Sequence, residues 1–98
     1  MIIENTIPHI IGSSNGNIRS INHNGAVFYS VIDFIEYATK SKLPKVYWKN
    51  LKGRCKSLNY VITPLKLISI DNKSRLTDCA TEGALWCIYK CIPKVSIK

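Results

Sequence analysis

The sequence predicts an α+β fold, in which two β-hairpins pack with three short helices in a single small domain. An Asn-Gly pair at 24–25 lies between two strand-like segments, three other segments repeat apolar residues at helical spacing, and a β-branched run at 60–70 contains a proline. With 98 residues and 46% apolar residues, the chain has the size and composition of one folded globular domain.

Residues 1–17 are expected to form an N-terminal arm or a short strand that precedes the domain proper at 18–98. The segment is rich in isoleucine, but Pro8 and the Gly-Ser-Ser-Asn-Gly stretch at 12–16 argue against a long regular element. Residues 18–23 and 26–29 then flank Asn24-Gly25, a pair that tolerates the positive φ angles of a type I′ turn. This pattern predicts the first hairpin.

Two helices are expected in the middle of the chain. Ser30 stands at an N-cap position before an amphipathic segment at 31–38, and Asp33 near its start complements the helix dipole. Pro44 suits the first position of a second helix that reaches about Ser57. On this second helix one arc is apolar and is expected to face the core: Tyr47, Trp48, Leu51, Cys55 and Leu58. A narrow stripe beside it is basic: Lys45, Lys49, Lys52 and Lys56.

The last third of the chain predicts a second hairpin and a final helix. Pro64 indicates an edge strand within 60–70, followed by a turn at 71–73 and a partner strand near 75–77. Thr81-Glu82 opens a helix over 83–92. Trp86 and Tyr89 lie off its apolar face, so they either contact a second subunit or protein partner or lie half-exposed on the surface.

The charge of the chain is strongly asymmetric. Fourteen basic residues oppose six acidic ones, giving a net charge of +8, and seven of the basic residues fall within 40–56. No carboxylate occurs between Glu36 and Asp71. Such a positive segment favours a polyanionic partner whose binding weakens as salt rises.

A membrane is not the expected partner. The apolar runs fall far short of the roughly 20 residues that a spanning helix needs, and the N-terminus lacks the pattern of a signal peptide. We therefore expect a reducing compartment, the cytoplasm. The four cysteines fit no Cys-x-x-Cys knuckle and are interpreted as buried thiols, while a zinc site using Cys79, Cys87 and Cys91 is the lesser alternative.

The order of these motifs resembles the Bro-N domain, which begins baculovirus BRO proteins, many phage antirepressors and the bacterial DNA-damage-inducible protein D family. The similarity spans about 18–94, and its most specific parts are Tyr47-Trp48 to Leu51-Lys52 and Thr77-Asp78 to Thr81-Glu82-Gly83. The chain departs from the pattern at Val46, where a basic residue is usual, and its Thr-Asp to Thr-Glu-Gly segment is one residue shorter.

The resemblance implies an α+β DNA-binding domain of a viral or prophage regulator, working in the bacterial or infected host cytoplasm, or in the nucleus if the virus infects eukaryotes. Duplex DNA is the expected partner, and no cofactor or metal is expected. The predicted nucleic-acid-binding residues are Lys40, Lys42, Lys45, Lys49, Lys52, Lys56, Lys66, Lys73 and Arg75. Lysines of the second helix would contact phosphates, those at its start would approach base edges, and the second hairpin would act as a wing.

The alternative classes of function are a protein-interaction module and a metal-dependent nuclease. A protein-interaction module that captures a repressor or a host defence protein would use the outer side of the last helix, around Trp86 and Tyr89. A metal-dependent nuclease would need Asp33, Glu36, Asp78, Glu82 or the histidines, but no acid pair has motif spacing, and the acids at helix starts have a structural explanation. We therefore expect a protein that is not an enzyme.

Overall fold

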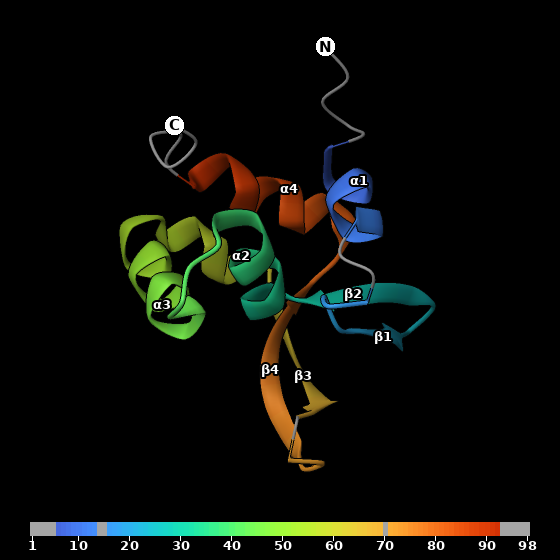
Figure 1. The fold of residues 1–98 in the computed structure, drawn as a ribbon. Coiled ribbons are helices and arrows are strands. Elements are labelled where there is room, and N and C mark those ends of the chain that lie inside the picture. The colour runs from blue at the N-terminus through green and yellow to red at the C-terminus, as the bar shows by residue number, and fades with distance from the viewer. Residues whose placement is uncertain (1–5, 14–15, 70, 93–98) are drawn as a thin grey trace.

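The computed structural model describes residues 6–13, 16–69 and 71–92 and has the predicted α+β architecture (Figure 1). The helices are α1 (Thr6–Ser13), α2 (Val31–Thr39), α3 (Pro44–Arg54), the short 3-10 helix η2 (Lys56–Tyr60) and α4 (Glu82–Cys91). The strands are β1 (Ser20–His23), β2 (Ala26–Ser30), β3 (Thr63–Ile68) and β4 (Ser74–Ala80).

The four strands form one antiparallel sheet in the order β1-β2-β4-β3. Strands β2 and β4 pair only at Tyr29 with Ala80 and at Ser30 with Cys79, whereas β3 and β4 pair along the whole of β3. The β3–β4 hairpin therefore leaves the body of the domain as a two-stranded arm (Figure 1). Pro64 lies on the edge strand β3, as predicted, where a missing N–H is tolerated.

The first hairpin and the helix after it confirm the local predictions. Asn24 and Gly25 have φ angles of 52° and 83°, the pair of positive values that a type I′ turn requires. Ser30 caps α2, because its Oγ accepts a hydrogen bond from the Asp33 N–H at 3.3 Å. The helix ends where Lys40 adopts a left-handed conformation and donates its N–H to the Glu36 carbonyl.

The prediction of an arm or a short strand at 1–17 is wrong for Thr6–Ser13, which forms helix α1. Residues 1–5 and 14–15 of that segment lie outside the described residues. Pro8 is compatible with this helix because it is the third residue, in the first turn, where the N–H has no intrahelical acceptor. Ile7 is buried and α1 packs against α4. The described residues thus contain four α-helices, one more than predicted.

Helix α3 begins at Pro44 as predicted but ends at Arg54, three residues short of the prediction. Cys55 leaves the helical region with φ −118° and ψ 79°, and Lys56–Tyr60 continues as the 3-10 helix. Gly53 weakens the last turn of α3, and the tighter 3-10 turn lets Leu58 enter the core. The basic stripe is interrupted as a result, because Lys56 no longer lies on α3.

The core lies between the helices and the joined ends of the two hairpins. Trp48 is buried as predicted, and Tyr47 packs against the buried residues. Trp86 and Tyr89 stack on each other with ring centroids 5.7 Å apart, and both are partly buried against the core. The fully buried larger apolar side chains are Val31, Phe34, Ile35, Leu51, Leu58, Leu85 and Ile88.

Two glycines provide a test of this backbone. We expect Gly25→Ala to lower the free energy of unfolding by about 1 kcal/mol, because the left-handed conformation strains any residue with a Cβ. Gly53→Ala should raise it by about 0.4–1 kcal/mol, since a Cβ there meets no atom within 4 Å and alanine favours the helix. Urea unfolding of both variants measures the two effects. Changes in the free energy of unfolding with the same sign would contradict either the left-handed turn at Gly25 or the helical conformation at Gly53.

Candidate nucleic-acid interface

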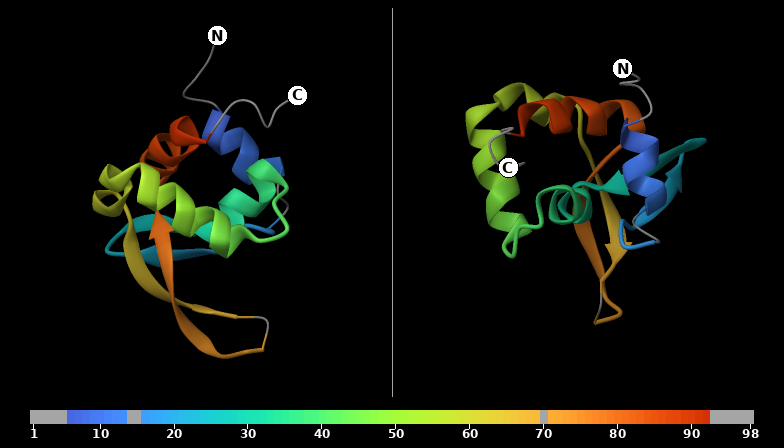
Figure 2. Two further views of the ribbon diagram at one scale, coloured as in Figure 1. Left: turned by 90° about the vertical axis from the view of Figure 1, so that its left-hand side faces the viewer. Right: turned by 45° about the horizontal axis from the view of Figure 1, so that its top comes forward.

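A single carboxylate joins α3 to the β3–β4 hairpin. Asp78 Oδ2 accepts hydrogen bonds from Trp48 Nε1 at 2.8 Å and from Lys52 Nζ at 3.1 Å. The Lys52 ammonium also lies 5.3 Å from the centre of the Trp48 ring, a cation–π distance. We call these three residues the Asp78 clamp. It holds α3 across the root of the hairpin (Figure 2).

The clamp identifies which side of the hairpin faces α3. Side chains alternate along a strand, so Asp78 shares one face of the hairpin with alternate residues of β4 and with their partners on β3. We call this the outer face: Pro64, Lys66, Ile68, Ser74, Leu76 and Asp78. Except for Asp78, the residues of the outer face are exposed. On the opposite face, Leu67, Thr77 and Cys79 are buried.

The α3 lysines lie on the same side of the helix as the clamp. Lys45, Lys49 and Lys52 are spaced four and three residues apart, so they belong to one ridge of the helix. Both are exposed. Lys52 was predicted to bind nucleic acid as well, but its side chain is 28% exposed and engaged by Asp78. Its role in the structure is to fix the ridge to the hairpin.

The other predicted cations are spread around this ridge. Lys42 is exposed between α2 and α3, and Lys56 is exposed on η2. Lys40 lies 4.8 Å from the centre of the Tyr37 ring, beside a cavity of about 380 Å³ that Asp33 and Glu36 also line. The prediction of one uninterrupted helical stripe is therefore wrong, and Lys45 and Lys49 are its exposed part on α3.

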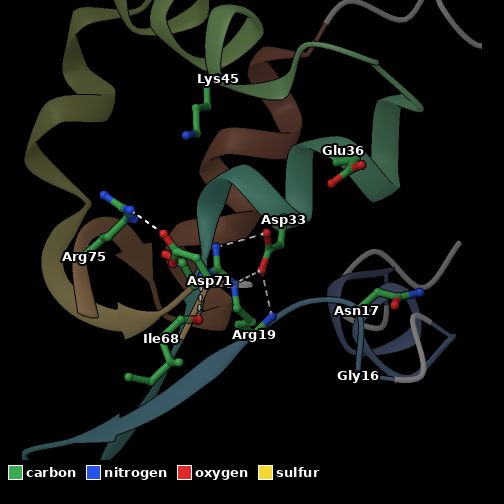
Figure 3. A pocket seen from close by; sticks show the side chains of 10 residues that line it. Gly16, Asn17, Arg19, Asp33, Glu36, Lys45, Ile68, Asp71 and Arg75 are labelled. Atoms are coloured by element: carbon green, nitrogen blue, oxygen red, sulfur yellow. Dashed lines mark hydrogen bonds and ion pairs between the residues drawn. The ribbon is translucent and has the colours of Figure 1, made fainter. Parts of the chain in front are cut away.

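A hollow of about 740 Å³ lies between the start of α3, α2 and the hairpin (Figure 3). Lys45, Arg19 and Arg75 line it together with Asp33, Glu36 and Asp71. The hollow thus brings two predicted cations, Lys45 and Arg75, to one place from segments thirty positions apart in the sequence. Its lining contains equal numbers of cations and acids, so its field is mixed.

Arg19 is a residue that the sequence reasoning did not select. Its Nε donates to Asp33 Oδ2 at 2.7 Å, its backbone N–H donates to the same oxygen, and its Nη1 donates to the Ile68 carbonyl at 3.1 Å. The hydrogen bond to Asp33 raises the pKa of Arg19 further, against the effect of burial. Arg19 therefore links the start of the first hairpin, α2 and the end of β3.

Asp71 orders the tip of the hairpin. It pairs with Arg75, and its Oδ1 accepts the Lys73 N–H at 3.2 Å. Asn72 in this turn has a φ of 65°. Arg75 is thus already engaged by a carboxylate, whereas Lys66 and Lys73 have no ion pair to any other described residue.

In the folded chain, acidic side chains that are distant in sequence lie close to the basic middle segment. Asp78 comes to Lys52, Asp71 to Arg75, and Glu36 lies beside the same hollow as Lys45. The expectation that no acid offsets the positive segment between Glu36 and Asp71 is therefore wrong for Lys52, which pairs with Asp78. Within the described ranges, four exposed cations on α3 and on the β3–β4 hairpin have no ion pair: Lys45, Lys49, Lys66 and Lys73.

The cysteines differ in their environments. Cys79 is buried as predicted, Cys55 and Cys91 are partly buried, and Cys87 is exposed, so the prediction of a buried thiol is wrong for Cys87. Burial raises the thiol pKa of Cys79, and burial together with the adjacent Cys55 thiol raises that of Cys91. No three His, Cys, Asp or Glu side chains of residues 6–13, 16–69 and 71–92 gather as metal ligands do.

In comparisons with protein-family models, curated proteins and solved structures, no match was found. The part of the chain that the structure describes contains no helix with the length and apolar character to cross a membrane.

The clamp can be tested by substitution. Asp78→Ala leaves the buried Trp48 indole N–H without an acceptor, so we expect it to lower the free energy of unfolding by about 1–3 kcal/mol. Asp78→Asn retains an acceptor and should cost less. The matched control is Asp71→Asn at the exposed tip, where the loss of a surface ion pair is worth at most about 1 kcal/mol. A cost of Asp78→Ala no larger than that of Asp71→Asn in thermal or urea unfolding would rule out the clamp.

Proposed function

We propose that this chain binds duplex DNA through the surface formed by α3 and the outer face of the β3–β4 hairpin. The observation that carries the proposal is the Asp78 clamp, which fixes two exposed basic segments beside each other. Lys45 and Lys49 come from the helix, and Lys66 and Lys73 come from the arm. Cations held at two elements suit a polyanion that presents charges along a rigid groove.

Charge also favours a polyanion. The net charge of +8 resides on a chain of 98 residues, and these four lysines are exposed and have no ion pair within the described ranges. Each phosphate contact releases condensed counterions, so the affinity should fall steeply with salt. Four contacts correspond to a slope of log affinity against log salt of about −3.6.

The regulatory role follows from the Bro-N resemblance alone. The Tyr47-Trp48 to Leu51-Lys52 segment forms the clamp helix, and Asp78 belongs to the Thr-Asp to Thr-Glu-Gly segment, so the two most specific parts of that resemblance meet in the structure. This meeting supports a shared architecture. On that basis we propose a viral or prophage regulator rather than an enzyme as the class of protein.

The test is a gel-shift titration with a duplex probe at several salt concentrations. We expect Lys49→Gln to make the salt slope less steep by about 0.9, because one phosphate contact is lost, and the double variant Lys45→Glu with Lys49→Glu to abolish retention. Lys90→Gln is the matched control, since Lys90 is an exposed lysine on α4. It should leave the slope unchanged.

Two results would contradict the proposal. Equal salt slopes for Lys49→Gln, Lys90→Gln and the unchanged protein would exclude α3 as the phosphate-binding element. A folded protein that retains no duplex at low salt would exclude DNA binding and favour the alternative, a protein-interaction module that uses Trp86 and Tyr89 on α4.

A further inference from the structure

The outer face of the hairpin exposes apolar side chains that the domain itself does not cover. Leu76 is 69% exposed and Ile68 is 58% exposed, among the largest exposures of apolar residues in the described chain. Leu76 pairs with Lys66, and Ile68 pairs with Ser74, so the two apolar residues are diagonal neighbours on one face. They form an apolar spot close to the tip of the arm, where residues 71–75 are all polar or charged.

The shape of the arm fits a groove of duplex DNA. Two paired strands lie about 4.8 Å apart, and a two-stranded ribbon enters a major groove that is about 12 Å wide. Residues 71–76 are all exposed, and the arm extends away from the helices (Figure 1). Its end can therefore enter a groove without moving another described element.

We propose that the outer face of the β3–β4 hairpin enters the major groove and that Leu76 and Ile68 contact the methyl groups of thymine bases. This inference rests on the proposed DNA binding and assigns the part of the surface that reads bases. Apolar side chains recognise the thymine methyl group, which only the major groove presents. Lys66, the partner of Leu76 across the hairpin, and Lys73, in the turn at its tip, bring positive charge to the same arm.

A second copy of the chain is a poorer occupant of this face. Two outer faces packed together would bring Lys66 of one copy toward Lys66 of the other, and like charges facing each other are destabilising. Pairing along the free edge of β3 is also opposed, because Pro64 and Lys66 are the residue types that protect sheet edges. The groove of a nucleic acid offers the opposite charge.

The experiment compares two duplexes that differ only in the thymine methyl group. The unchanged full chain is titrated against an alternating dA–dT duplex and against the same duplex with deoxyuridine in place of thymidine. Deoxyuridine keeps every hydrogen-bonding group of both grooves. We expect the dA–dT duplex to bind about fourfold more tightly for each methyl group that becomes buried, the ratio that corresponds to about 0.8 kcal/mol per buried carbon.

A double variant identifies the side chains. Leu76→Ala with Ile68→Ala should bind both duplexes with the weaker affinity that the unchanged chain has for the deoxyuridine duplex, so that the ratio falls to one. Val27→Ala is the matched control, an exposed aliphatic residue on β2 of the other hairpin, and it should keep the ratio. The substituted side chains are all exposed, and unfolding curves verify that the fold is intact.

The outcomes separate this inference from the proposed function. Equal affinity of the unchanged chain for the two duplexes, with a normal salt slope, overturns the methyl contact and leaves phosphate binding in place. A methyl preference that persists in the double variant overturns the assignment to Leu76 and Ile68. Retention of neither duplex overturns the proposed DNA binding itself.

Discussion

The hydrogen bond from the buried Trp48 indole to Asp78 is the constraint on which the functional surface depends. It links α3, which packs against α2, to β4, and Lys52 donates a second hydrogen bond to the same Asp78 oxygen. Without an acceptor the indole N–H would be buried at a cost, so the core of the domain and the position of the basic elements are stabilised by the same contact. The clamp thereby fixes the position of α3 relative to the β3–β4 hairpin, and with it the positions from which the exposed lysines extend.

Much of the fold could be predicted because it depends on neighbouring residues. The turn at Asn24-Gly25, the Ser30 and Thr81 caps, Pro44 at the start of α3 and the edge position of β3 each follow from steric or hydrogen-bonding preferences within a few residues. The exposed position of Lys45 and Lys49 on α3 also follows from helical spacing. These features need no knowledge of which distant segments meet.

The remaining features depend on contacts between distant segments. Asp78 and Trp48 are thirty positions apart, and Arg19 and Asp33 are fourteen apart, so periodicity along the chain does not indicate either pair. Helix α1 was missed because Pro8 and the glycines outweighed the isoleucines in local reasoning, while Ile7 gains a buried position only once α4 is present. The interpretation of Asp78 as a helix-start acid is wrong, because Asp78 lies in β4 and accepts hydrogen bonds from Trp48 and Lys52.

Because the junction between β2 and β4 is short, the local stability of the backbone should fall from the base of the arm to its tip. Only two residue pairs attach the hairpin to the rest of the sheet, and Cys79 and Ala80 at that junction are fully buried, whereas residues 71–76 are all exposed. Backbone amides near the base should therefore exchange slowly with solvent, and those toward the tip should open locally at little cost. A ribbon that is stiff where it is attached and compliant at its end can follow the curvature of a surface while its base keeps a fixed direction.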